Sequence, residues 1–147
     1  TGHARRLQSI NNKTWTTAMI QLITHYEKKY FRWHDSGDIQ TVDHLAKICA
    51  VAAGTPSIKH WLPTREAGIL DQYKKAGGAI PSNLVIRLSA TMVNGAPGKS
   101  HTHSSTVHTA AAAPIGEACN AGKQGGRCLD CRSCWNQSIK NISYEKH

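Results

Sequence analysis

The sequence predicts an α/β fold, in which βαβ units form a small, mainly parallel sheet and a C-terminal cysteine-rich metal-cluster loop follows. Stretches with helical spacing alternate with short β-rich runs, which is typical of right-handed βαβ units. Four of the five cysteines lie within residues 117–136. The 147 residues fit one domain, residues 1–147, whose core needs neither metal nor disulfides to form. We expect residues 1–12 to be flexible.

Three segments predict the helices. Residues 13–30 carry apolar side chains at the spacing of an amphipathic helix. Residues 41–54 form the second predicted helix, with Asp38 or Thr41 as its N-cap and a glycine at its end. Residues 67–78 end in two glycines. Cys49 lies on the apolar stripe of the second helix, which favours a small buried side chain over a metal ligand.

Strands are expected between and after these helices. Residues 31–38 and 58–66 are short β-rich runs that end in polar residues, and residues 83–93, NLVIRLSATMV, form the clearest strand of the chain. Residues 104–112 and 141–147 are two further candidates. Strands and helices in this order predict a parallel sheet.

Polar side chains follow the predicted strands, and in parallel sheets functional groups gather beyond the carboxyl ends. We name these residues the strand-end group: His34, Asp35, Asp38, Arg65, Glu66, Arg87 and Ser89. They suit either a binding site or a structural polar network. Because a charged residue in an apolar strand needs a partner, we expect Asp35, Asp38 or Glu66 beside Arg87. We also expect the cysteine-rich loop to close over this group.

The cysteine segment, residues 117–136, supplies the strongest chemical signal. Its four thiols belong to Cys119, Cys128, Cys131 and Cys134. Disulfides between residues three apart would close strained rings. Zinc normally takes two separate C-x-x-C pairs, whereas C-x-x-C-x-x-C with a fourth, distant cysteine is typical of a [4Fe–4S] cluster. The spacing therefore favours [4Fe–4S], held by all four cysteines, with zinc as the lesser alternative.

The charge of the chain favours an anionic partner. The formal net charge is +9 and the isoelectric point is about 9.6, which is typical of proteins that bind nucleic acid or another polyanion. No apolar run approaches the ~18 residues that cross a membrane, and no signal peptide opens the chain. We therefore expect no membrane association and a reducing cytosol, where clustered cysteines usually hold metal. The oligomeric state does not follow from the sequence.

Four blocks in a fixed order resemble a known family. FRWHDSGD, LPTRE, RLSA and C-x-x-C-x-x-C-W occur in this order, and the similarity runs from about Lys13 onward. Together they resemble the bacteriophage Gene product 88 family, whose members are phage or prophage proteins, many with a longer N-terminus and further cysteines. The resemblance implies a phage-encoded protein in the cytoplasm of an infected bacterium or in the virion. It implies no particular reaction.

Several functions fit these residues. The first is a small iron–sulfur protein that binds nucleic acid through its charge and through Trp33, Trp61 and Trp135. The second is an enzyme whose strand-end group binds a small anionic substrate. The third is a redox or virion structural component, and a structural zinc protein is a further alternative. Because four thiolates would leave no iron open to substrate, a binding or structural role ranks above an enzyme.

Overall fold

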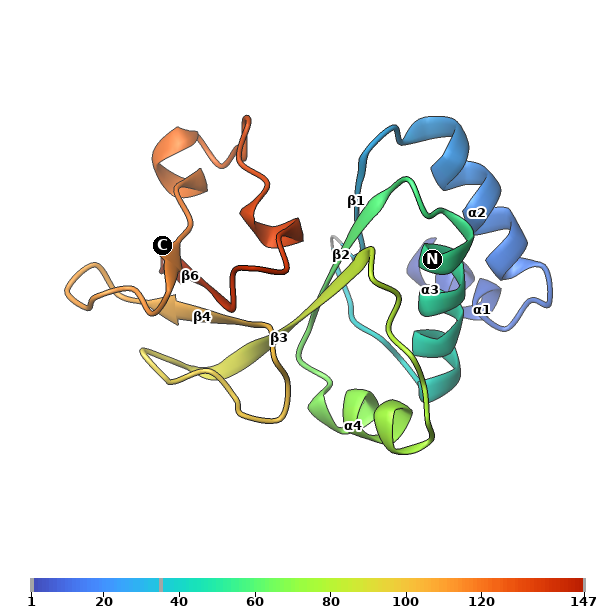
Figure 1. Cartoon of the computed structure of the whole chain (residues 1–147), viewed down its shortest axis with the longest axis horizontal. Helices are drawn as coiled ribbons and strands as arrows, with labels where there is room; N and C mark the ends of the chain where they lie inside the picture. Colours follow the sequence, from blue (N-terminus) through green and yellow to red (C-terminus); the bar gives the residue numbers. More distant parts are fainter. Residues whose placement is uncertain (1, 35, 147) are drawn as a thin grey trace.

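The computed structural model describes residues 2–34 and 36–146 (Figure 1). The helices are α1 (Gly2–Ser9), α2 (Trp15–Tyr26), α3 (Val42–Gly54) and α4 (Ala67–Lys75), with two short 3₁₀ helices, η1 (Ala121–Gln124) and η2 (Ser133–Trp135). The strands are β1 (Tyr30–Arg32), β2 (Lys59–Thr64), β3 (Leu84–Val93), β4 (Ser104–His108), β5 (Glu117–Ala118) and β6 (Asn141–Glu145).

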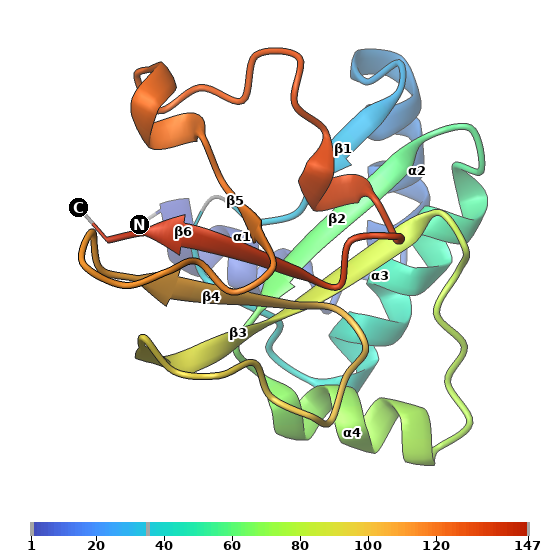
Figure 2. The ribbon, with the colours of Figure 1, turned by 60° about the vertical axis from the view of Figure 1, so that its left-hand side comes forward.

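All described strands join one sheet in the order β1-β2-β3-β4-β6-β5, and every neighbouring pair is parallel. The first three strands are linked through α3 and α4, as βαβ units require. The strands fan out strongly, so that the sheet is curled (Figure 2). The predicted α/β class with a small parallel sheet is therefore confirmed.

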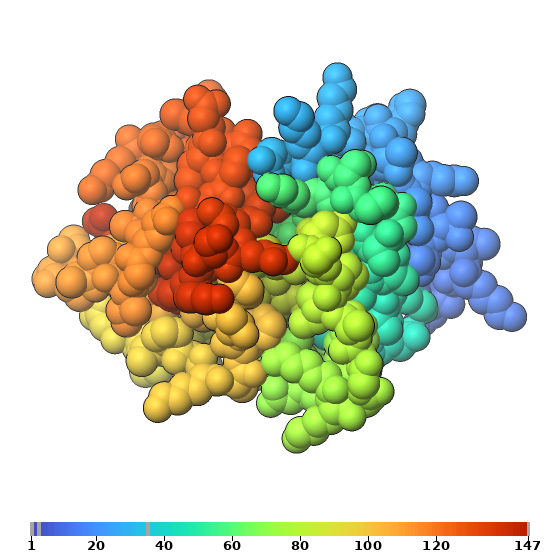
Figure 3. Space-filling view, viewed as in Figure 1, coloured from blue at the N-terminus to red at the C-terminus, as the bar shows by residue number. Residues whose placement is uncertain are grey.

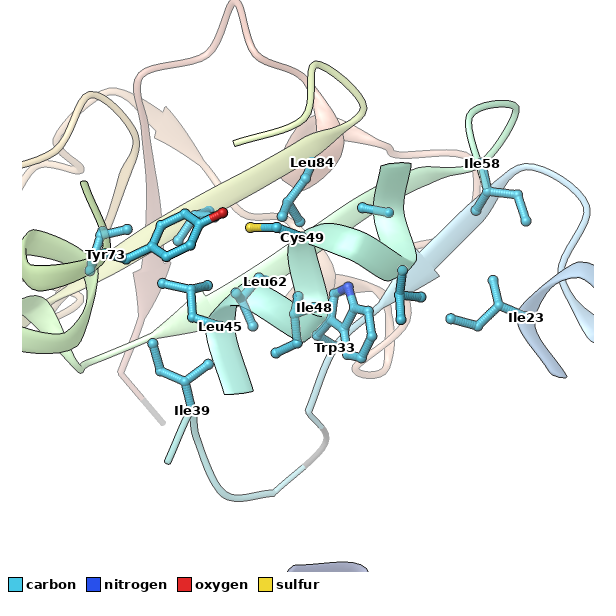
Figure 4. Close-up of a cluster of buried hydrophobic side chains, with 14 residues drawn as sticks. Ile23, Trp33, Ile39, Leu45, Ile48, Cys49, Ile58, Leu62, Tyr73 and Leu84 are labelled. Atoms are coloured by element: carbon cyan, nitrogen blue, oxygen red, sulfur yellow. The ribbon is translucent and has the colours of Figure 1, made fainter. Parts of the chain in front are cut away.

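The two faces of the sheet are covered differently because successive side chains of a strand point to opposite faces. On one face Leu62 of β2 and Ile86 of β3 pack with Leu45 and Ile48 of α3 in the main hydrophobic core (Figure 4). On the other face, Trp61 packs in a smaller cluster with residues of the C-terminal segment. In the space-filling view, the orange and red C-terminal residues form one side of the molecule and the blue to green residues the other (Figure 3).

Most of the expected elements occur, with shorter bounds. The helix expected over residues 13–30 ends at Tyr26, because Tyr30 already pairs in β1 with Lys59. Thr41 is the N-cap of α3, and its Oγ1 accepts a hydrogen bond from the His44 N–H at 3.0 Å. Cys49 is buried in the main core, as predicted. The structure adds α1 within residues 1–12 and the two-residue strand β5, neither of which was expected.

A buried histidine connects three elements in the main core. His60 of β2 has no exposed surface; its Nδ1 accepts the Trp33 Nε1–H at 3.2 Å, and its Nε2 lies 2.8 Å from Thr55 Oγ1. Thr55 Oγ1 in turn donates to the carbonyl of Val51 at 2.9 Å. Nδ1 must stay unprotonated to accept the Trp33 hydrogen bond, so the imidazole is neutral. Burial lowers the pKa of His60 from 6.5 to about 4.

This pKa predicts how stability depends on pH. Because the folded pKa of His60 is depressed, the unfolded chain binds one more proton between the two values, and stability is lost as the pH falls from about 6.5 to about 4. His60 alone should account for about 3 kcal/mol of that loss. The test is urea unfolding of the wild type and of His60→Gln at pH 7 and at pH 4.5, each about half a unit above one of the two pKa values. The free energy of unfolding should change less between these two pH values in the variant than in the wild type. His25→Gln, on the exposed side of α2, should retain the wild-type dependence; identical slopes in all three proteins would contradict the assignment.

Candidate metal centre

The four cysteines of the cysteine segment line one pocket on the face of the sheet opposite α3. Cys119, Cys128, Cys131 and Cys134 all contribute to its wall, and Ile142 of β6 forms part of its floor. Cys49 lies in the main core on the other face. The structure thus brings together the four residues that the spacing singled out, and it separates the fifth cysteine from them.

Two of these cysteines are fixed by the sheet. Cys119 directly follows β5, and its N–H donates to the carbonyl of Ser143 at 2.8 Å. Cys134 lies on η2, is only 7% exposed, and packs with Trp61 and Ile142. Cys128 and Cys131 are exposed. The site therefore has an anchored half and a solvent-facing half.

The thiols are close without forming a cage for one ion. Within residues 2–34 and 36–146, no three His, Cys, Asp or Glu side chains are placed to hold a metal ion. The pocket that the four cysteines help to line measures about 20 Å³, room for roughly one water molecule. Any metal group held by all four thiols would therefore have to move the exposed half of the segment outward.

The anchored half is held by Arg87, which is 0% exposed. Its guanidinium donates to the carbonyls of Cys134 (Nε, 2.9 Å), Asn136 (Nη2, 2.9 Å), Ile139 (Nη1, 3.0 Å) and Ser133 (Nη2, 3.1 Å), and more weakly to Ser104 (Nη1, 3.5 Å). Four of these five carbonyls belong to residues 133–139. One side chain from the centre of the sheet thus fixes the course of the chain at the last cysteine.

Arg87 is buried without a carboxylate in contact. Among the described residues it makes no ion pair, and burial lowers its pKa. The groups that oppose this shift are, in order, the Cys134 thiol, the Tyr144 phenol and Glu117. An arginine side chain nevertheless stays charged in proteins. The pocket therefore lies beside a buried positive charge. A thiolate at Cys134 would be the negative charge that offsets it most strongly.

Burial raises the pKa of the Cys134 thiol to about 11. Tyr144 Oη, 3.4 Å from its sulfur, and the Arg87 charge act in the opposite direction. The pKa of Tyr144 is itself raised by burial and by Cys134. Without a metal, Cys134 is thus a neutral thiol at pH 7, and forming a thiolate there requires a cation that binds it directly.

Trp61 presents an unused donor in the same cluster. Its Nε1–H is buried and has no hydrogen-bond partner in the described part of the chain, while its ring packs with Cys134 and with the edge of Trp135 at 5.1 Å. A buried N–H without an acceptor costs free energy.

The strand-end group divides into separate contacts. Asp38 is a structural clamp: it accepts hydrogen bonds from Thr64 Oγ1 at 2.5 Å and from the Arg65 N–H at 2.7 Å. Glu66 donates its N–H to Thr64 Oγ1, and its side chain is exposed. Ser89 lies 3.1 Å from the hydroxyl of Ser105. Asp35 lies outside the described residues.

Two expectations about this group are wrong. Arg87 does not pair with Asp38 or Glu66, because its side chain points to the opposite face from the helices and bonds to backbone carbonyls. The cysteine segment also does not close over the strand ends. It packs instead on the sheet face, where Cys134 meets Trp61 and Ile142. Face alternation along β2 and β3 is the physical reason for both differences.

His34 lies in a different pocket, of about 460 Å³, between α1 and the end of β1. Its backbone has a φ of 55°, and among the described residues its buried Nδ1 has no partner. Burial lowers its pKa, with Asp38 opposing. Trp15 and His44 also line this pocket. His34 and Asp38 are thus near one another, on a site apart from the cysteines.

Sequence reasoning missed the residues that surround the thiols. Tyr144 and Ile142 lie on β6. The alternating run NISYE could have predicted a strand with one side facing the interior. Trp33 and Trp61, expected as contacts for nucleic acid, are instead buried at 3% and 6% exposure. Of the three tryptophans named for that role, Trp135 alone reaches the surface in part.

The fold and the site define a small α/β protein with a parallel sheet, helices on one face and a four-cysteine pocket on the other. The family model described as Gene product 88 matches residues 1–137, and the chain belongs to this family. The expected resemblance is thereby confirmed, and it supports the viral origin that it implied. No curated protein and no solved structure matches the chain. Among the described helices, none has the length and apolar character to span a bilayer.

The hydrogen bonds of Arg87 lead to a stability prediction. Arg87→Met keeps the apolar length but removes the side-chain hydrogen bonds to four carbonyls of residues 133–139, so the free energy of unfolding should fall by about 3 kcal/mol or more. Arg65→Met, at an exposed arginine, should change it by less than about 0.5 kcal/mol. Urea unfolding of both variants measures this difference. Equal stability of the two variants would contradict a holding role for Arg87.

Proposed function

We propose that this protein is a phage-encoded iron–sulfur protein in which Cys119, Cys128, Cys131 and Cys134 hold a [4Fe–4S] cluster, and that it binds an anionic partner. The observation that carries the first part is the position of the four thiols around one pocket, next to a buried arginine without a carboxylate. The residues present fit such a group in their chemistry, since they offer four sulfur ligands and no competing buried carboxylate.

Electrostatics favours an anionic centre at this place. Four thiolates around a cluster carry more negative charge than the iron core neutralises, so cations and N–H donors nearby stabilise the site. Arg87 supplies a buried cation beside Cys134. Lys123, Arg127 and Arg132 add exposed positive charge along the segment. The same charges would leave an empty, neutral pocket less stable than a filled one.

Ligand spacing favours the cluster over zinc. Zinc–sulfur bonds of about 2.3 Å bring four thiolates to about 3.8 Å from one another around a single ion, and zinc normally takes two separate C-x-x-C pairs. A cubane is wider and meets each thiolate at a separate iron, as the C-x-x-C-x-x-C run suits. Cys128 and Cys131, being exposed, can move outward to accommodate it. Structural zinc is the second candidate for the same residues.

A [4Fe–4S] cluster supplies electron transfer or a structural clamp when bound. Four cysteine ligands leave no iron open for a substrate, which favours binding, redox or virion structural roles over catalysis at the cluster. The alternative of an enzyme at the strand-end group is weakened, because Asp38 and Arg87 are occupied by structural hydrogen bonds.

The second part of the proposal is an anionic partner. Nucleic acid is the class of partner that strongly basic proteins most often bind. Support comes from the net charge of +9. Family membership and the absence of a spanning helix among the described residues are compatible with action in the cytoplasm of an infected bacterium or in the virion.

Paired cysteine variants test the metal assignment. In anaerobically purified protein we expect about four irons per chain and a brown colour. Cys131→Ser should lose most of the iron, because it removes one ligand, whereas Cys49→Ser should retain it, because Cys49 lies in the main core. Iron, acid-labile sulfide and zinc are measured in the same samples. One zinc per chain without iron would overturn the cluster, and equal loss of metal in both variants would overturn the ligand set.

A further inference from the structure

A second pocket lies next to the cysteine segment, at the amino ends of β1, β2 and β3. It measures about 680 Å³. Tyr30 begins β1, Lys59 begins β2, and Asn83 directly precedes β3, while Arg132 and Trp135 of the cysteine segment form the opposite wall. It adjoins the thiol pocket, with which it shares Ser133 and Trp135, and none of the strand-end group lines it.

We propose that this pocket binds one nucleotide unit of a single-stranded nucleic acid, with the phosphate at Lys59 and Arg132 and the base against Tyr30 and Trp135. The inference rests on the proposed anionic partner, and it names the class of that partner and the residues that meet it.

The positive charges of Lys59 and Arg132 favour a phosphate group as the ligand. Lys59 and Arg132 are both exposed, and no aspartate or glutamate is among the residues that line the pocket. Ser133, one of the lining residues, donates its Oγ–H to the carboxylate of Glu117. Arginine and lysine are the residues that most often meet phosphate oxygens, and here they occupy two walls of one pocket.

The aromatic wall selects a base. Tyr30 and Trp135 are half-buried, with ring centroids 5.6 Å apart at 68°. Trp135 is held in place, because its Nε1 donates to the carbonyl of Phe31 at 3.0 Å and its ring meets Trp61. The Arg132 guanidinium covers one face of the Tyr30 ring, 5.2 Å from its centre, and also donates to the carbonyls of Leu129 and Cys131. A base would stack on Tyr30 in its place when the guanidinium turns to a phosphate.

The shape and the remaining groups favour a single strand. Bases in a duplex are stacked and paired, so a recessed aromatic wall reaches them only when the strand is open. Asn83 uses its amide nitrogen on the carbonyls of Ala52, Thr55 and Ile58, which leaves its amide oxygen as an acceptor beside the aromatic rings. The remaining side chains of the lining are mostly serines and amides, which tolerate different bases.

The pocket also depends on the cysteine segment. Arg132, Ser133 and Trp135 stand beside Cys131 and Cys134, and Arg87 holds the carbonyls of residues 133 and 134. A metal group on these cysteines would order the same wall. Binding of the strand should therefore weaken when the metal is lost.

The test uses metal-loaded full-length protein and a fluorescein-labelled oligothymidylate of about 12 nucleotides, within the range of single-strand sites. Fluorescence anisotropy at about 50 and 200 mM salt gives the affinity and its salt dependence. Tyr30→Leu should weaken binding about tenfold, and Lys59→Gln should lower the salt slope by about 0.7, the share of one phosphate on a single strand. The matched controls, Tyr26→Leu at a 73% exposed tyrosine and Lys99→Gln at an exposed lysine, should stay within about twofold of wild type.

The outcomes separate the two proposals. If the wild type binds no strand even at low salt, the nucleic-acid form of the proposed anionic partner fails. If the wild type binds and the pocket variants match their controls, the pocket assignment is wrong while the anionic partner stands. Competition with free AMP identifies the source of the nucleotide, and AMP that binds as tightly as the strand would overturn the single-strand assignment. Because Lys59 is exposed, Lys59→Gln should fold and keep the test decisive even if Tyr30→Leu does not.

Discussion

The buried guanidinium of Arg87 is the interaction on which the functional half of this protein depends. It projects from the middle of the sheet and donates to carbonyls of residues 133–139, which have no regular secondary structure beyond one turn of 3₁₀ helix. Backbone N–H groups within this loop reach the carbonyls of Ser133 and Asn136, and the Arg87 guanidinium supplies further donors that hold the loop on the sheet face. By supplying them, Arg87 brings Cys134 to the pocket and sets the position of Trp135.

The two faces of the sheet are stabilised by different interactions. One face is an ordinary hydrophobic core under α2, α3 and α4, and it accounts for the fold. The other face buries little apolar surface and joins polar backbone, thiols and one cation. Because its stability depends on a charge without a carboxylate, it gains from any anionic group that the thiols can hold. The same residues shape the adjoining cationic pocket, so the proposed metal site and the proposed partner site would share one wall.

The sequence predicts the secondary structure well, but it predicts contacts between residues far apart in the chain only in part. Helical and β-rich periodicity located α3, β2, α4 and β3 because those elements bury a regular stripe. Cysteine spacing singled out four thiols that line one pocket, because three of them follow one another at a fixed interval; their role as metal ligands stays a prediction. The partners of Arg87 could not be predicted, since backbone carbonyls carry no sequence signal. The strand β5 is two residues long and leaves no pattern, and its pairing depends on the position of β6.

The central claim is that the four thiols hold a four-iron cubane beside Arg87. The most direct measurement is a Mössbauer spectrum of protein produced with ⁵⁷Fe and isolated without oxygen. The account predicts that most of the iron gives the overlapping quadrupole doublets of a diamagnetic [4Fe–4S]²⁺ cluster with four thiolate ligands. A spectrum from isolated ferrous or ferric ions, or protein that carries no stoichiometric iron, would contradict it.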